Sequence, residues 1–204
     1  MSDTPIAANL PDHDTSQDGR RLRSADSRKR IVTAMLDLVQ AGSVAPGAEE
    51  VALRAGVGLR TVFRQFRDME GLYREMLEST RGDFVDCFTT PLSPGTWGDR
   101  LIEMSERLCR VFDLRLPLRR AGLVRRYHSP SLNGGIIALT VALRDVLAAE
   151  LPPDVARDTV RSARFLMIMS FDTWMHLRDE QGLTARQASR VVRAGLDDLI
   201  ASHA

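Results

Sequence analysis

Apolar residues recur along most of this chain at intervals of three and four positions, the spacing that places them on one face of an α-helix. No segment keeps the alternation of apolar and polar residues, with β-branched enrichment, that is typical of a strand. We therefore predict an all-α protein. The predicted helices cover about 26–41, 48–55, 59–66, 67–88, 97–113, 117–128, 131–150, 153–180 and 184–202.

Prolines and glycines separate the predicted helices, because proline interrupts a helix and glycine frequently ends one. Residues 1–19 contain two prolines, several aspartates and no apolar period, so we expect them to form a disordered tail. The joints between helices are Gly42, Pro46-Gly47, the stretch 91–99, Pro117, Ser129-Pro130, Pro152-Pro153 and Gly182.

Length and composition are those of an ordinary globular protein that can bury a core: 204 residues, 44% of them hydrophobic and 27% charged. No stretch reaches the roughly 18 uninterrupted apolar residues of a membrane-spanning helix, and the polar N-terminus lacks the apolar core of a secretion signal. Cys87 and Cys109 are too few for a disulfide framework or a metal knuckle. These features favour a protein of the reducing cytoplasm.

The formal net charge of +1 conceals an uneven distribution of charge. Between Gly19 and Arg67 lie ten basic and four acidic residues, a charge of +6, whereas the rest of the chain has eighteen basic and twenty-three acidic residues, a charge of −5. A basic end on a mildly acidic body is expected when that end meets a polyanion such as nucleic acid. The alternative is a chance fluctuation of solvated surface charge.

Residues 48–66 carry the most specific pattern, two short helices joined by a glycine-containing turn, which is typical of a helix-turn-helix. The helices of this unit cross closely, and Ala52 and Ala55 provide the small side chains that a close crossing needs. Gly56 can adopt the left-handed conformation that the turn requires, and Val57 provides an apolar plug beneath it.

The second helix of this pair has one apolar and one polar face. Val62 and Phe66 lie four positions apart and are expected to face the core. The polar face suits a DNA groove, because arginine can bind guanine through two hydrogen bonds and threonine offers a methyl or a hydroxyl. The alternative is the solvated face of a helical corner. The outward residues are Leu59, Arg60, Thr61, Arg64 and Gln65, with Phe63 at the boundary.

Residues 26–77, taken together, resemble the DNA-binding domain of the TetR family of bacterial transcriptional regulators. The order, spacing and length of the matching elements all fit, whereas the rest of the chain agrees only in being helical and of suitable length. The matching residues are Ile31-Val32-Thr33-Ala34, Val51-Ala52, Ala55-Gly56-Val57, Thr61-Val62-Phe63, Phe66 and Glu70-Gly71-Leu72-Tyr73.

The resemblance implies an all-α homodimer in which each three-helix head places helix 59–65 in the major groove of a palindromic operator. It divides the chain into a tail with a basic arm (1–23), a helix-turn-helix DNA-binding head (24–68), and a helical ligand-binding and dimerisation domain (69–204). The residues expected to contact DNA are Leu59, Arg60, Thr61, Phe63, Arg64, Gln65, Arg28 and Arg67.

This chain departs from the family pattern at four positions of the head. Gly47 and Gly58 stand where the family usually has a threonine or serine helix cap, and glycine is the weaker cap. Phe63 replaces a tyrosine and Met69 a lysine, both of which commonly contact phosphate. We hypothesise that Arg67 and an arginine-rich arm replace these contacts; the alternative is a solubilising tail. The arm comprises Arg20, Arg21, Arg23, Arg28, Lys29 and Arg30.

By resemblance, the helices of the C-terminal domain are expected to surround a cavity for a small-molecule effector. Methionine's flexible thioether tolerates ligands of varied shape, although methionine and aromatic residues are more often plain core. The expected ligand contacts are Met104, Leu108, Phe112, Tyr127, Phe165, Met169 and Trp174.

Two apolar segments are candidates for subunit pairing. Segment 164–177 has large apolar residues on most faces, and the last helix carries an apolar stripe. The resemblance suggests that these helices pair with their symmetry mates in a four-helix bundle; the alternative is a core within one chain. The expected interface residues are Met175, Val191, Val192, Leu196 and Leu199.

Common catalytic motifs are absent from the sequence: it has no glycine-rich phosphate loop, no His-Glu-x-x-His, no nucleophile elbow and no cluster of cysteine and histidine. We therefore expect no catalysis, no cofactor and no metal. The function expected from the resemblance is that of a transcriptional repressor that a small molecule releases from DNA. An activator of the same class is an open alternative that the sequence does not separate from a repressor. The alternative from another class is a helical ligand-binding or scaffolding protein whose head has lost DNA binding.

Overall fold

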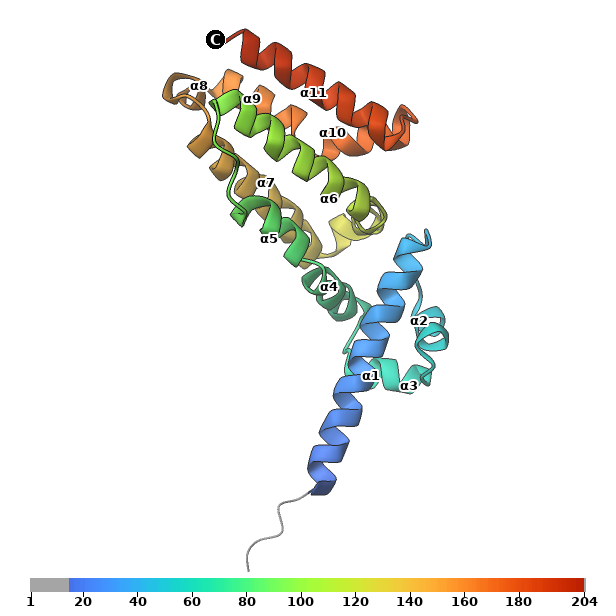
Figure 1. The fold of residues 1–204 in the computed structure, drawn as a ribbon. Helices are drawn as coiled ribbons and strands as arrows, with labels where there is room; N and C mark the ends of the chain where they lie inside the picture. Colours follow the sequence, from blue (N-terminus) through green and yellow to red (C-terminus); the bar gives the residue numbers. More distant parts are fainter. Residues whose placement is uncertain (1–14, 204) are drawn as a thin grey trace, which may run out of the picture.

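The computed structural model describes residues 15–203, and within this range every regular element is helical. Figure 1 shows a small head at one end and a larger helical body at the other. The head consists of α1 (Thr15–Gln40), α2 (Ala48–Ala55) and α3 (Leu59–Gln65), and α4 (Met69–Ser79) lies between head and body. The prediction of an all-α fold is confirmed for this part of the chain.

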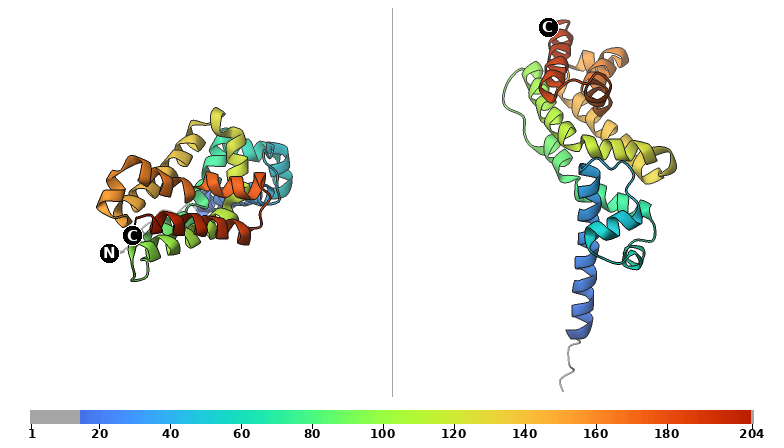
Figure 2. Two further views of the ribbon diagram at one scale, coloured as in Figure 1. Left: turned by 90° about the horizontal axis from the view of Figure 1, so that it is seen from above. Right: turned by 90° about the vertical axis from the view of Figure 1, so that its right-hand side faces the viewer.

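The body is built around α6 (Trp97–Arg125), a helix of 29 residues that packs against both α7 (Pro130–Glu150) and α11 (Ala185–Ala201) (Figures 1 and 2). The remaining elements are α5 (Gly82–Thr89), the 3-10 turn η1 (Arg126–His128), α8 (Pro153–Arg157), α9 (Thr159–Ile168), α10 (Phe171–Met175) and the π-helical turn η2 (His176–Glu180).

The core of the body lies between α6 and the helices that follow α8. Met104, Leu108, Phe165, Trp174 and Leu196 are each at most 1% exposed and belong to one apolar cluster. Burying large apolar side chains of this kind is the main stabilising contribution to the fold. This cluster keeps α6, α9, α10 and α11 together as a rigid support for the rest of the body.

The core of the head is continuous with one corner of the body. Ile31, Val51 and Leu72 are fully buried in the cluster that joins α1, α2 and α4. The same cluster includes Leu118, Ala121 and Leu132 from α6 and α7. The head is therefore held to the body by direct apolar packing as well as by the chain itself.

Helix α1 begins at Thr15, eleven positions before the predicted start near residue 26. The prediction relied on apolar periodicity, which residues 15–26 lack, but their arginines, glutamine and alanine have good intrinsic helix propensity. The first part of α1 projects from the head (Figure 1), and Leu22 on it is 71% exposed. Residues 1–14 of the expected tail lie outside the described range.

Three predicted helix boundaries in the body are wrong. Helix α6 continues through Pro117, where a joint was predicted, because buried residues on both sides of the proline hold the helix in place. The predicted helix 67–88 is divided into α4 and α5. The predicted helix 153–180 is interrupted by new N-caps at Asp158 and Ser170, whose side chains accept backbone hydrogen bonds. The short helices α2 and α3 and the long helices α7 and α11 match their predictions within one residue.

Helix α7 is unusually apolar for its position. Its segment Leu132–Glu150 has a mean hydropathy of 1.5 and is long enough to cross a bilayer, and 17% of that window is buried in the chain. The core helix of a water-soluble protein can have the same length and composition. Several of the apolar residues of α7 line the cavity described below.

Candidate nucleic-acid interface and cavity

Helices α2 and α3 form the predicted helix-turn-helix. Gly56 follows α2 in the left-handed conformation, with φ 62° and ψ 41°, and its N–H donates to carbonyls of the last turn of α2. Gly47 and Gly58 occupy the N-cap positions of the two helices, and neither has a side chain that could cap them. The two weak caps inferred from the sequence are therefore present in the structure.

The outer face of α3 carries most of the predicted DNA contacts. Val62, at 1% exposed, anchors the helix in the core of the head. Leu59 is 38% and Phe63 51% exposed, which is high for large apolar side chains. Arg60 and Arg64 are exposed on the same helix, Thr61 is half-buried, and Arg67 is exposed just after the helix ends. This face combines cationic and apolar groups within two helical turns.

Two residues predicted to contact DNA have hydrogen-bond partners inside the head. The Nε of Arg28 donates to Glu75 of α4 at 2.9 Å, its Nη1 donates to the carbonyl of Gln65, and its guanidinium lies 4.2 Å from the centre of the Phe66 ring. The side-chain amide of Gln65 donates to Ser24 Oγ at 2.9 Å. Arg28 and Gln65 therefore tie α1, α3 and α4 together, a role that helical spacing alone could not reveal.

The basic arm predicted from the sequence forms part of a helix in the described range. Arg21, Arg23 and Lys29 are exposed on α1. Arg30 turns back toward the head, and its Nη2 donates to the carbonyls of Ala55 (2.5 Å) and Gly56 (3.1 Å). A cation at a helix C-terminus is favoured by the helix dipole, so Arg30 stabilises the turn after α2.

Helix α4 is held by both the head and the body. On one face, Leu72, Tyr73 and Met76 are buried in the core of the head. The guanidinium of Arg125 from α6 lies 4.4 Å from the centre of the Tyr73 ring, and burial raises the pKa of the Tyr73 hydroxyl above its ordinary value. Ser129, just before α7, donates to Glu70 at 3.0 Å. A shift of α6 or α7 would therefore be transmitted to α4.

A cavity of about 490 Å³ lies beside the other face of α4, between α4, α5, α6 and α7. Its volume falls in the range of small-molecule sites in proteins. Most of the lining is apolar, with a few arginines among the apolar side chains. The lining residues are Arg74, Leu77, Glu78, Thr80, Arg81, Phe84, Val85, Phe88, Arg115, Leu118, Arg119, Gly122, Leu132, Gly134, Gly135, Ile136, Ala138, Leu139, Ala142 and Phe171.

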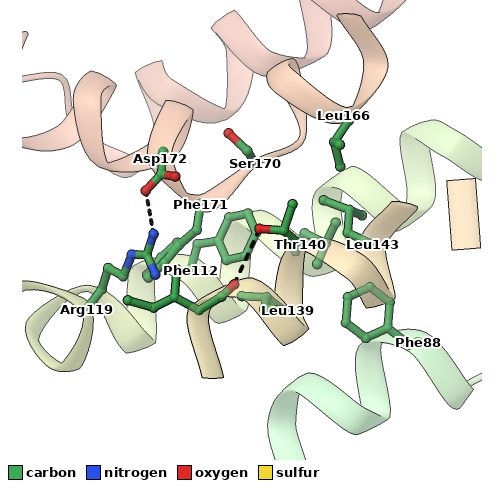
Figure 3. Close-up of a pocket in the computed structure, with 12 residues that line it drawn as sticks. Phe88, Phe112, Arg119, Leu139, Thr140, Leu143, Leu166, Ser170, Phe171 and Asp172 are labelled. Atoms are coloured by element: carbon green, nitrogen blue, oxygen red, sulfur yellow. Dashed lines mark hydrogen bonds and ion pairs between the residues drawn. The ribbon is translucent and has the colours of Figure 1, made fainter. Parts of the chain in front are cut away.

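A second pocket of about 20 Å³ adjoins this cavity and shares Phe88, Arg119 and Phe171 with it (Figure 3). Figure 3 shows the guanidinium of Arg119 beside Phe171, paired with Asp172. At this volume the pocket holds no more than a water-sized group. It extends the larger cavity toward the core of the body.

None of the seven predicted ligand contacts lines the large cavity, so that prediction is wrong for this cavity. Leu108 and Phe112 line the small adjoining pocket and, with Met169 and Trp174, a further void of about 10 Å³ in the core of the body. Tyr127 is 86% exposed on η1. Helical spacing identifies buried faces but does not separate close-packed core from residues beside a void. Met104 and Phe165 are packed in the core of the body, as are Met169 and Trp174 around that small void.

Sequence signals for the cavity nevertheless exist. Gly134 and Gly135 interrupt an otherwise apolar helix and leave part of its surface without side chains. Arg115 and Arg119 lie four positions apart, which places both on one face of the helix, and the residues between them, Leu116, Pro117 and Leu118, are apolar. The two glycines and the two arginines would have indicated the cavity more accurately than the methionine and aromatic positions did.

Most of the predicted dimer residues are buried within the chain itself. Val192, Leu196 and Leu199 are 3%, 0% and 6% exposed and pack in the body core, so they are not available to a partner and that prediction is wrong. Val191 is 42% exposed and Met175 is half-buried. The apolar stripe of α11 therefore faces α6 and α9, as in the alternative of a core within one chain.

Solved structures with the same arrangement of helices are known. A transcriptional regulator from Rhodococcus sp. Rha1 superposes with a TM-score of 0.68 over 86% of this chain and 96% of its own, at 17% sequence identity. A TetR-family transcriptional regulator from Streptomyces coelicolor superposes with a TM-score of 0.64 over 85% of this chain and 81% of its own, at 21% identity. The fold is that of the TetR-family regulators.

The likeness of the TetR-type fold extends over head and body together, because each superposition covers more than four fifths of the chain. At the level of sequence, no family model and no curated protein matches this chain. At this low identity, the similarity establishes the fold alone.

Proposed function

We propose that this protein is a homodimeric, DNA-binding transcriptional regulator, a repressor that a small molecule releases from a palindromic operator. The observation that carries the proposal is the outer face of α3, where Arg60, Arg64 and Phe63 are exposed on a helix anchored by Val62. The helix-turn-helix supports this face from behind, as sequence readout in a major groove requires. On this proposal the protein acts by binding DNA in the cytoplasm, and not by catalysis.

The chemistry of α3 suits direct readout of bases. Arg60 and Arg64 can bind guanine or phosphate, and the exposed rings and methyls of Phe63 and Leu59 suit the methyl group of thymine. The absence of a hydroxyl on residue 63 removes one phosphate contact. The exposed cations of α1, including Arg21 and Arg23, are the candidates to replace it, because α1 projects beyond α3 (Figure 2).

A dimer would place two heads on successive major grooves, roughly 34 Å apart. The exposed apolar residues of α9 and α11 are the candidates for the pairing surface in this proposal. Val160 and Met167 on α9 are 71% and 63% exposed, and Val191 on α11 is 42% exposed. Large apolar side chains exposed together favour a protein interface.

Release by a ligand follows from the position of α4. Leu77 and Glu78 line the cavity, whereas Leu72 and Met76 on the same helix are part of the head core. A ligand that prefers the geometry incompatible with DNA by ~3 kcal/mol would weaken operator binding ~150-fold. Coupling of this size is sufficient to relieve repression.

The first test is fluorescence anisotropy of the full-length protein with the DNA upstream of its own gene, titrated across salt concentrations. We expect tight binding to one fragment, a steep salt dependence, and at least a tenfold loss with Arg60→Ala. Arg186→Ala, which alters an exposed arginine on α11, serves as the matched control and should bind normally. Weak and equal binding to every fragment would overturn the proposal and favour a ligand-binding protein with an inactive head.

A further inference from the structure

Arginine is the main charged residue of the large cavity, where two of the arginines pair with Asp83 and Asp172 beside the lining. Its lining contains four arginines and one glutamate, a formal charge of +3, among side chains that are otherwise apolar or neutral. Arg74 and Arg81 are exposed, and Arg81 pairs with Glu78 at 3.4 Å. The two buried arginines of the lining, Arg115 and Arg119, are only 8% and 9% exposed. Buried charge of this kind needs a partner, because burial removes the hydration of the guanidinium group.

Each buried arginine has one satisfied and one unsatisfied side. Nη2 of Arg115 donates to the carboxylate of Asp83 and to the carbonyl of Thr80, and Nη2 of Arg119 donates to Asp172. The Nε atoms of both arginines are buried and have no hydrogen-bond partner in the described part of the chain. Leaving a buried N–H of a charged group without an acceptor is unfavourable. Each guanidinium therefore keeps one N–H group that no acceptor in the described part of the chain satisfies.

The two guanidinium groups face the cavity from one side of α6. Residues four apart on a helix are neighbours on the same face, so one small anion can reach both. The guanidinium of Arg119 lies 5.4 Å from the centre of the Phe171 ring, a contact that keeps it oriented (Figure 3). One carboxylate has two oxygens, so it can accept hydrogen bonds from both guanidinium groups when it displaces their present partners.

The remainder of the cavity suits an apolar body. Phe84, Phe88 and Leu139 contribute large apolar side chains. At Gly134 and Gly135 an added Cβ would meet no atom within 4 Å, so α7 leaves open space there. With roughly 30 Å³ for each water-sized group, about 490 Å³ accommodates a molecule of at least ~16 non-hydrogen atoms.

We propose that the cavity binds an amphipathic carboxylate, an apolar molecule whose single carboxylate lies between Arg115 and Arg119. This inference rests on the proposed function in one respect only, which is that the bound molecule acts as the effector. The carboxylate competes with Asp83 and the Thr80 carbonyl for Arg115. Thr80 caps the C-terminus of α4, and Asp83 lies in the first turn of α5. Releasing both from Arg115 removes hydrogen bonds that join α6 to the end of α4 and the start of α5.

The direct test is isothermal titration calorimetry of the full-length protein with dodecanoate, below its micelle concentration, in the absence of DNA. We expect one site per chain, and at least tenfold weaker binding of dodecanol and of dodecylamine, which lack the carboxylate. Arg119→Gln should weaken dodecanoate binding at least tenfold. Equal affinity for dodecanoate and dodecanol, or unchanged binding by Arg119→Gln, would overturn the proposal.

A second variant does not disturb a buried charge. Gly135→Leu places a side chain in the open part of the cavity and should abolish dodecanoate binding while the circular dichroism spectrum stays unchanged. Ala149→Leu adds the same side chain at an exposed position of α7 outside the cavity, and should bind normally. Normal binding by Gly135→Leu would show that the ligand lies elsewhere.

The two proposals fail in different ways. Dodecanoate binding with no effect on operator affinity would uphold the carboxylate site and overturn its role as an effector site. Sequence-specific DNA binding with no dodecanoate binding would uphold the regulator and overturn the carboxylate site. Operator affinity that falls when dodecanoate binds, and recovers with Gly135→Leu, would support both.

Discussion

On the proposed function, each exposed residue of the head either contacts DNA or orients the residues that do. Arg60 and Arg28 are both arginines in the basic part of the chain, and the sequence pattern treats them alike. In the structure Arg60 is exposed, whereas Arg28 contacts Glu75, the Gln65 carbonyl and the Phe66 ring. The two therefore affect DNA binding for different physical reasons, and salt dependence can separate them.

Replacing Arg28 with methionine should lower the free energy of unfolding by about 1 kcal/mol, because it removes a partly exposed ion pair and a hydrogen bond to the end of α3. Operator affinity should also fall, with an unchanged salt slope, since no phosphate contact is lost. Arg60→Ala should reduce the slope by ~1 if Arg60 contacts phosphate. Urea unfolding and salt-titrated anisotropy provide the two measurements. A reduced slope for Arg28→Met would indicate that Arg28 contacts the DNA backbone after all.

The cysteines give a prediction about reactivity. Burial raises the pKa of the Cys109 thiol to about 11 and also raises that of Cys87. At pH 8 only about one Cys109 in a thousand is then a thiolate, the reactive form. We expect the native protein to react negligibly with a thiol-specific disulfide reagent at pH 8, and faster as the pH rises toward 11. In denaturant both thiols should react at once, and rapid labelling of the native protein would contradict this.

Among the helices, the sequence predicted best where one face of a helix is apolar and its ends are marked. Helices α2, α3 and α11 satisfy both conditions. The start of α1 could not be predicted from apolar spacing, because residues 15–26 form a helix without an apolar face. The predicted break at Pro117 is wrong because the packing around the proline outweighs the one hydrogen bond that it removes. The cavity escaped prediction for a related reason: it is formed partly by glycines, which have no side chain to report their surroundings.

The projecting part of α1 can be tested by removing residues 1–22, which keeps Ser24 and its hydrogen bond to Gln65. Arg20 and Arg21 are lost, so operator affinity should fall about tenfold and the salt slope by ~2. Thermal stability should stay the same, because the removed segment contributes no described residue to the core of the head. Unchanged affinity and slope would leave this segment with no role in DNA binding.

On the proposed function, the whole molecule acts as a dimer that holds two heads at a fixed separation, so the pairing surface decides the activity. Introducing Met167→Glu on the exposed face of α9 should convert the dimer to a monomer and weaken operator binding at least a hundredfold. Leu114→Glu, which changes a 58% exposed residue on α6, is the control. Light scattering after size-exclusion chromatography gives the mass of each variant. A Met167→Glu variant that stays dimeric would place the interface elsewhere.

The body completes the core of the head with three residues, Leu118, Ala121 and Leu132. This shared core limits how such a protein can diversify. A head that ends at a flexible linker can be exchanged between regulators as a module, with a change of operator and no change of effector. Here an exchanged head would meet a foreign surface at the corner of α6 and α7. A functional chimera should therefore need these three residues to be transferred along with α1–α4, and in evolution the corner and the head should change together.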